Sequence, residues 1–239
     1  MTPPQRNPDS RPAVGLMILL GATYPVLAHL AVLDRRPMLI AASIGFLVLL
    51  VLLPGLRDRR PLAWITLPIA SLGLVAAIGS GHALQLLFLP PVLINGFMAW
   101  LFGHTLLPGR TPLIERVVHA MHGPDATDVT AEVIAYARGV TQAWAGLFVI
   151  LTAANFLLAA LARPGGLLSS AGLDPGVSVP LGMWSLFANV LNYVIVAALF
   201  VAEFVVRRRR FPQSPYRSFV DFSRRLASLD RMFRQAGRD

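Results

Sequence analysis

Histidine and carboxylate side chains are the first candidates for acid–base chemistry in this 239-residue chain, which has 5 His and 12 Asp or Glu residues. His29 and Asp34 have the His-x4-Asp spacing in which a carboxylate can orient an imidazole, so that the imidazole deprotonates an acceptor hydroxyl. Such a pair arises readily by chance at this composition, and it normally belongs to a soluble α/β domain for which the chain has no room. We therefore expect no catalytic residue here.

Three other histidines raise the question of a metal site. His119 and His122 are three residues apart, and His104 ends an apolar segment. Two imidazoles at this spacing can face one metal ion, but the spacing offers no third ligand. We expect these histidines to lie near lipid phosphates, with no metal site and no cofactor. The chain has no Cys, which excludes disulfides and thiolate metal sites.

Polar side chains within apolar segments are stronger candidates, because a polar group in lipid is costly and usually faces the interior of a helix bundle. In the last apolar segment, Asn189 and Asn192 fall near the helical face of Glu203, within about 40° in an uninterrupted α-helix. Facing asparagines commonly hold helices together, and we favour that role over a substrate path. The candidate intramembrane polar face comprises Asn95, Asn155, Asn189, Asn192 and Glu203.

Arginine supplies the entire basic charge, because all 21 Lys+Arg residues are Arg and the net charge is +9. This choice, together with abundant Ala, Gly and Pro, indicates a GC-rich and bacterial genome. The excess favours anionic partners such as lipid head groups or an acidic protein, and we expect no nucleic acid partner. The candidate residues for head-group or partner binding are Arg110, Arg116, Arg138, Arg207, Arg208, Arg209, Arg210, Arg217, Arg224 and Arg225.

Long apolar segments must position these residues, since 55% of the chain is hydrophobic and only 14% is charged. A soluble domain of this size could not bury such an excess, and several segments are as long as a bilayer is thick. The sequence therefore predicts an all-α, polytopic transmembrane helical bundle over residues 14–206. The six expected spans cover residues 14–33, 38–54, 62–78, 83–107, 140–161 and 183–206.

Shorter segments outside the spans have patterns of their own. Pro90 and Pro91 remove two amide donors within the fourth span and predict a kink or a break there. Residues 112–122 are apolar on one face, which predicts an interfacial amphipathic helix. Residues 207–239 begin with four Arg and continue with Phe and Leu at helical spacing, which predicts a basic amphipathic cytoplasmic tail. Residues 1–13 are expected to form a disordered cytoplasmic arm.

The distribution of arginine predicts the orientation. Six spans place both termini on one side of the membrane, and that side then holds 18 of the 21 Arg residues. Short loops rich in Arg remain cytoplasmic. We therefore expect a bacterial inner-membrane protein with cytoplasmic N- and C-termini.

Three segments carry a resemblance to a known family: LLFLPPVLINGFMAWLFGHTLLPGRTPLIERV, YARGVTQAWAGLFV and WSLFANVLNYVIVAALFVAEFVVRRRRFP. In this order they resemble an uncharacterised family of bacterial multi-spanning inner-membrane proteins, encoded in gene clusters for aryl polyenes and related fatty-acid-like products. The resemblance covers residues 86–212, about half the chain. It implies a setting in which acyl chains grow on a soluble acyl carrier protein, and it transfers no catalytic residue.

These observations lead to three hypotheses about function. The first is a non-catalytic accessory of aryl polyene or related lipid biosynthesis, which recruits acidic acyl-carrier or synthase components to the membrane through its Arg-rich tail. The second is a transporter or flippase of the acylated product, with the polar face lining the path. The third, a membrane acyl- or glycosyltransferase, lacks a convergent acid, base and nucleophile. Membrane lipids are expected partners in each case.

Overall fold

The computed structural model describes residues 23–34, 36–122 and 130–211. These residues divide into two compact units, which we call unit 1 and unit 2. Unit 1 contains the described residues up to 93 together with residues 153–193, and unit 2 contains the remainder. The expected arm, residues 14–22 of the first expected span, and nearly all of the expected tail lie outside the described residues.

Five helical stretches of the described chain are long and apolar enough to cross a membrane. They are Pro37–Arg57, Pro61–Gly79, Ala83–Leu106, Ala131–Leu161 and Leu181–Arg210. Each contains or closely matches one of the last five expected spans. The first expected span is described only in part, as a helix of residues 23–34.

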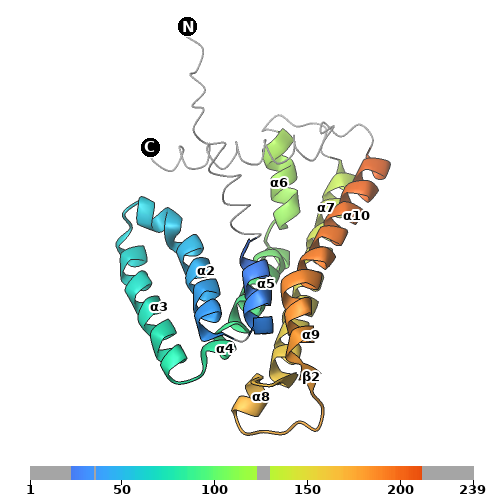
Figure 1. The fold of residues 1–239 in the computed structure, drawn as a ribbon. Coiled ribbons are helices and arrows are strands. Elements are labelled where there is room, and N and C mark those ends of the chain that lie inside the picture. The colour runs from blue at the N-terminus through green and yellow to red at the C-terminus, as the bar shows by residue number, and fades with distance from the viewer. Residues whose placement is uncertain (1–22, 35, 123–129, 212–239) are drawn as a thin grey trace. The chain divides into compact units, whose positions relative to one another are not determined.

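Helices α2 (Pro37–Arg57) and α3 (Pro61–Gly79) form an antiparallel pair in unit 1 (Figure 1). Each begins with a proline, whose missing N–H would have no partner at a helix start anyway. At Gly55 a Cβ atom would lie 2.9 Å from the Cβ of Ala63, so only glycine allows the two helices to approach this closely.

The fourth expected span is interrupted, as the two prolines predict. Helix α4 (Ala83–Leu86) and helix α5 (Leu89–Gly103) are separated by a turn at residues 87–88. Pro90 and Pro91 then occupy the first turn of α5, where a missing N–H breaks no helical hydrogen bond. A short 3-10 helix, η1 (His104–Leu106), completes this stretch.

Helix α6 (Leu113–His122) lies where the amphipathic segment is expected, and α7 (Ala131–Leu161) is the longest helix of the described chain, with 31 residues. Between α7 and the last span, a segment expected to be a plain loop contains β1 (Ala162–Arg163), α8 (Leu167–Ser170) and β2 (Val179–Pro180). The two strands pair in parallel, with Ala162 opposite Val179.

The last span is not one uniform α-helix. It consists of α9 (Leu181–Leu186), a π-helical segment η2 (Phe187–Leu191) and α10 (Asn192–Arg210). The expected register between Asn189 and Glu203 assumed an uninterrupted α-helix, so it does not hold across η2. Within α10, Asn192 and Glu203 keep the expected register.

The core of unit 1 is built largely from small residues, because six of its thirteen buried members are alanine. Small residues let transmembrane helices pack closely where lipid gives no hydrophobic drive for association. The largest members are Phe88 and Trp184, whose rings meet edge to face with centroids 4.6 Å apart. The full set is Tyr24, Ala28, Ala31, Val32, Ile40, Ala83, Leu87, Phe88, Ala159, Ala162, Leu181, Trp184 and Ala188.

Unit 2 has an aromatic core instead. Trp144 of α7 lies 6.0 Å from Phe102, 5.6 Å from Phe148 and 6.1 Å from Phe200, measured between ring centroids. Phe200 belongs to α10, so this cluster holds α7 against the second half of the last span (Figure 1).

Candidate functional site

A group of polar side chains lies buried within the spans of unit 1. His29 and Ser185 join the helix of residues 23–34 to α9, with 2.9 Å between His29 Nδ1 and Ser185 Oγ. Ser185 is fully buried and His29 is half-buried. A contact between residues 156 positions apart has no signature in the sequence, and this pairing is the main feature that sequence reasoning missed.

The π-helical segment is stabilised by a side chain. Asn189 Nδ2 donates to the main-chain oxygen of Ser185 at 3.1 Å and also approaches Ser185 Oγ at 3.2 Å. Because a carbonyl can only accept, this contact fixes which end of the Asn189 amide is the NH2 group. Side chains that enter the main-chain ladder are a common cause of local helix distortion.

Two further residues of the expected polar face, Asn155 and Asn192, meet about one helical turn from Asn189. Asn155 Nδ2 of α7 donates to Asn192 Oδ1 at 3.2 Å, and both side chains are buried. The structure therefore brings together three of the five residues of the expected polar face within unit 1, with His29 and Ser185 added. The other two, Asn95 and Glu203, belong to unit 2.

In unit 2, Glu203 is engaged by a neighbour on its own helix. Glu203 Oε1 lies 3.0 Å from Arg207 Nε, one turn further along α10, and the two side chains are only 16% and 21% exposed. The Arg207 guanidinium also lies 5.8 Å from the ring centre of Phe204. Asn95 is buried in α5. The described contacts of Glu203 therefore favour a structural role.

The end of α10 is fastened to the start of α7 by Arg210. Arg210 Nε lies 3.0 Å from Glu132 Oε1, and its guanidinium lies 6.0 Å from the ring centres of both Tyr136 and Phe211. The Tyr136 hydroxyl donates to the main-chain oxygen of Glu203 at 3.4 Å. Charge–ring contacts of this kind contribute most where they are shielded from water.

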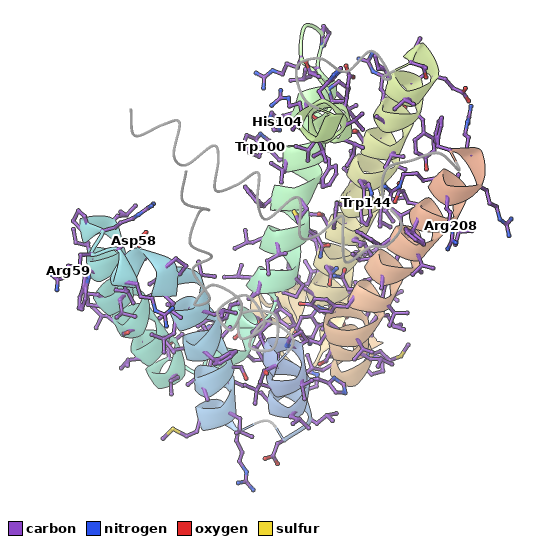
Figure 2. The ribbon with its side chains drawn as sticks, turned by 90° about the horizontal axis from the view of Figure 1, so that it is seen from above. Asp58, Arg59, Trp100, His104, Trp144 and Arg208 are labelled. Atoms are coloured by element: carbon purple, nitrogen blue, oxygen red, sulfur yellow. The ribbon has the colours of Figure 1, made fainter. Side chains whose placement is uncertain are left out.

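Arg208 and Arg209 differ from their two neighbours. Both are exposed on α10, and neither makes an ion pair with a residue in the described part of the chain. Figure 2 shows Arg208 on α10 and Trp144 on α7. Four consecutive arginines thus divide into two that hold the helix end and two that face outward.

The expected head-group residues Arg110, Arg116 and Arg138 are also exposed in unit 2. Arg116 Nε donates to Thr111 O at 2.9 Å. Arg138 lies on α7 three residues before Thr141, whose Oγ1 accepts the N–H of Ile114 at 3.3 Å. Arg217, Arg224 and Arg225 lie outside the described residues.

Buried threonines hold the start of α6. Thr105 Oγ1 accepts the N–H of Leu113 at 3.1 Å, and Thr141 Oγ1 accepts that of Ile114. The first amides of a helix have no partner in the helix itself, so these two hydroxyls act as caps supplied from η1 and α7. Sequence patterns show helix caps that are local in the chain, but not caps from a distant segment.

The histidines noted in the sequence have other partners. Asp34 pairs with Arg36 at 3.1 Å, while His29 pairs with Ser185, so the described contacts give no His29–Asp34 pair. His104 stacks on the exposed Trp100 with 4.5 Å between ring centroids (Figure 2). His119 lies 3.9 Å from Glu115. Among residues 23–34, 36–122 and 130–211, no group of three His, Asp or Glu side chains could hold a metal ion.

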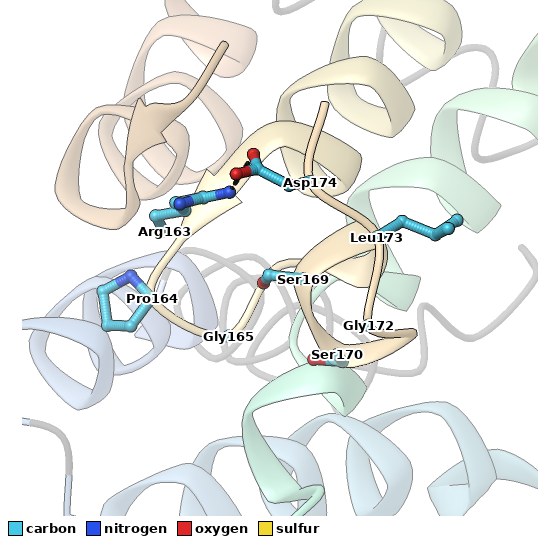
Figure 3. Close-up of a pocket in the computed structure, with 8 residues that line it drawn as sticks. All are labelled: Arg163, Pro164, Gly165, Ser169, Ser170, Gly172, Leu173 and Asp174. Carbon is cyan, nitrogen blue, oxygen red and sulfur yellow. Dashed lines mark hydrogen bonds and ion pairs between the residues drawn. The ribbon is translucent and has the colours of Figure 1, made fainter. Parts of the chain in front are cut away.

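An open pocket of about 480 Å³ lies in unit 1, at the segment between α7 and α9 (Figure 3). Arg163 Nη2 and Asp174 Oδ1 form an ion pair at its edge. Gln85 Nε2 reaches this segment from α4 and donates to Ser170 Oγ at 2.8 Å. The polar side chains at this pocket therefore mainly hold the segment in place. It is lined by Arg163, Pro164, Gly165, Ser169, Ser170, Gly172, Leu173 and Asp174.

Comparisons of the chain with known protein families, with curated proteins and with solved structures found no match. The two sites therefore rest on their own geometry: a buried polar cluster in unit 1, and an arginine-rich helix end in unit 2.

Proposed function

We propose that this protein is a non-catalytic accessory of the bacterial inner membrane, which recruits acidic acyl-carrier or synthase components of aryl polyene or related lipid biosynthesis. It crosses the membrane six times, with both termini and the end of α10 in the cytoplasm. Residues 14–33 supply the first span, α6 lies in the cytoplasmic surface of the membrane, and residues 212–239 continue the basic surface.

The observation that carries this proposal is that the four arginines ending α10 differ in their contacts: two are engaged by other side chains and two are exposed. Arg207 and Arg210 are engaged by Glu203, Glu132 and nearby rings, so the helix end is held. Arg208 and Arg209 then present two exposed guanidinium groups that make no ion pair within the described part of the chain. A helix end that is already held loses less backbone entropy on binding than a loose chain does.

The electrostatics suit an acidic partner in the cytosol. Exposed charges act over about 8–10 Å at physiological ionic strength, so Arg208 and Arg209 attract anions mainly at close range. Complementary charge chiefly raises the rate of association. Recruitment should therefore weaken steeply as the salt concentration rises.

The orientation is supported by the pattern of arginine. If each of the five apolar stretches crosses the membrane, the turn between α2 and α3, the segment before α7 and the end of α10 share one side. With the expected first span added, that side carries 18 of the 21 Arg residues, which is the distribution of a cytoplasmic face.

Crosslinking of the intact protein in native membranes, followed by mass spectrometry of captured proteins, tests the proposal. We expect the wild type to capture acyl carrier protein or synthase subunits, and R208Q/R209Q to lose most of that capture. The matched control is R57Q/R59Q, which removes two exposed arginines from the turn region between α2 and α3 in unit 1.

A second variant ends the chain after Phe211 and removes the expected basic tail. We expect it to lose recruitment as well, while the thermal stability of the spans is kept. Equal capture by the wild type, by R208Q/R209Q and by the truncated chain would overturn the proposal. Equal loss in R57Q/R59Q would show a general effect of net charge and would also count against it.

Transport of the acylated product is a second candidate, favoured by the buried polar cluster in unit 1. Asn192 would contribute to the path, and Asn192→Leu would leave the product on the wrong leaflet of the membrane. A leaflet-resolved assay of the product tests this candidate. A wild-type distribution in the Asn192→Leu variant would argue against it.

A further inference from the structure

Two hydrogen-bond donors are buried in the core of unit 1 without an acceptor in the described part of the chain. Tyr24 is 3% exposed and Trp184 is 1% exposed. Neither the Tyr24 hydroxyl nor Trp184 Nε1 has a hydrogen-bond partner among the described residues. An unpaired donor is costly in hydrocarbon, where no water replaces the missing acceptor. Such groups therefore call for an acceptor that the described residues do not supply.

Both donors lie close to one contact between two helices. The hydrogen bond of His29 with Ser185 ties the helix of residues 23–34 to α9. Trp184 directly precedes Ser185, and Tyr24 lies five residues before His29, about 7.5 Å along the helix axis. Both side chains also belong to the same buried core. The two donors are thus part of one region of unit 1.

The surroundings define the chemistry of the missing acceptor. Every other member of this core is aliphatic or is the Phe88 ring, and none of the buried polar side chains in the described part of unit 1 is charged. An anionic head group would have no counter-charge in it, and a cation would have no carboxylate. The fitting ligand has an apolar body and a neutral oxygen that accepts one or two hydrogen bonds.

We propose that Tyr24 and Trp184 form a binding site for the carbonyl oxygen of a lipid acyl ester. Lipid chains are the apolar bodies that surround the protein, and their ester carbonyls are neutral acceptors. A buried water molecule could supply the same kind of acceptor oxygen. The two sources differ in whether they select the ligand by its carbonyl group. A carbonyl site selects esters over ethers, whereas a water site does not distinguish the two.

The test uses the full chain in detergent and two photoreactive probes with the same diazirine-bearing sixteen-carbon chain. One probe is a methyl ester and the other is the methyl ether that lacks the carbonyl. We expect the ester to label the wild type about five-fold more than the ether, as one hydrogen bond predicts. Tyr24→Phe and Trp184→Phe should each lower ester labelling towards the ether value.

Trp64→Phe is the matched control, because it removes the same indole N–H as Trp184→Phe from a side chain that is 58% exposed and lies outside this core. Its labelling should equal that of the wild type. Tyr24→Phe should unfold at the same temperature as the wild type or higher, since it removes a donor that no described residue accepts from. Equal labelling by ester and ether in the wild type would overturn the proposal and indicate water. Ester labelling of Trp184→Phe at the level of Trp64→Phe would also overturn it.

Discussion

At the residue scale, the Thr141 hydroxyl links α7 to α6 through two hydrogen bonds. Its hydroxyl donates to Ala137 O at 2.8 Å and accepts the N–H of Ile114 from α6. Thr141→Val keeps the shape but leaves that amide without its acceptor, so we expect a loss of roughly 1–3 kcal/mol in the free energy of unfolding. Unfolding in SDS titrations measures it.

Thr152→Val is the control for this prediction. The Thr152 hydroxyl donates to Phe148 O on its own helix, at 2.7 Å, and accepts no N–H from another helix among the described residues. We expect a clearly smaller effect than at Thr141. Equal losses at the two positions would show that Thr141 does not support α6.

The pair of Asn155 and Asn192 offers a second measurement at this scale. Hydrogen bonds between transmembrane helices contribute about 0.6 kcal/mol on average and up to about 1.7 kcal/mol. We expect a double-mutant cycle of Asn155→Ala and Asn192→Ala to give a coupling free energy within that range. A coupling of zero would mean that the two amides do not hold the helices together.

Sequence reasoning could identify buried polar residues but not their partners. Asn155, Asn189 and Asn192 stand out because each interrupts an apolar run, and all three are buried. Glu132 and Tyr136 precede the expected span of residues 140–161, where polar residues are expected, and Thr141 lies at the very start of that span. Which side chains contact one another depends on tertiary packing, and these long-range contacts cannot be predicted from a single sequence.

At the element scale, the length of an apolar run largely determines where a span begins and ends. Residues 38–54 and 62–78 were expected as spans, and α2 and α3 extend each by three residues or fewer at either end. The π-helical segment at Phe187–Leu191 was not expected. Its sequence is as apolar as the rest of the span, and the Asn189 side chain contacts Ser185 at this point.

The contact of Arg210 with Glu132 should restrain the end of α10 with little effect on global stability. The two side chains are 55% and 60% exposed, and exposed ion pairs contribute about 0–1 kcal/mol. In Arg210→Gln we expect faster hydrogen exchange at the amides of residues 207–211 and an almost unchanged unfolding free energy. Arg209→Gln removes the same charge without an ion pair in the described chain, and its exchange should match the wild type.

At the scale of the whole molecule, the absence of cysteine makes the topology directly measurable. Single cysteines can be placed in the intact chain and exposed in spheroplasts to a maleimide that does not cross membranes. Ser80 and Val177 lie exposed between spans. Because these connections hold few arginines, Ser80→Cys and Val177→Cys should react at once. Pro108→Cys lies in the connection before α6, on the same expected side as the turn between α2 and α3, and should react only after permeabilisation.

The same measurement decides the number of spans. With five crossings from α2 onward, the two termini would lie on opposite sides of the membrane, and a sixth crossing by residues 14–33 returns them to one side. Both Ser10→Cys and Gly237→Cys should therefore be protected until the membrane is permeabilised. If position 10 reacts together with position 80 while position 237 stays protected, the chain crosses five times. A reversed pattern at positions 80 and 108 would place the arginine-rich end of α10 outside the cell, beyond the reach of any cytosolic acyl carrier.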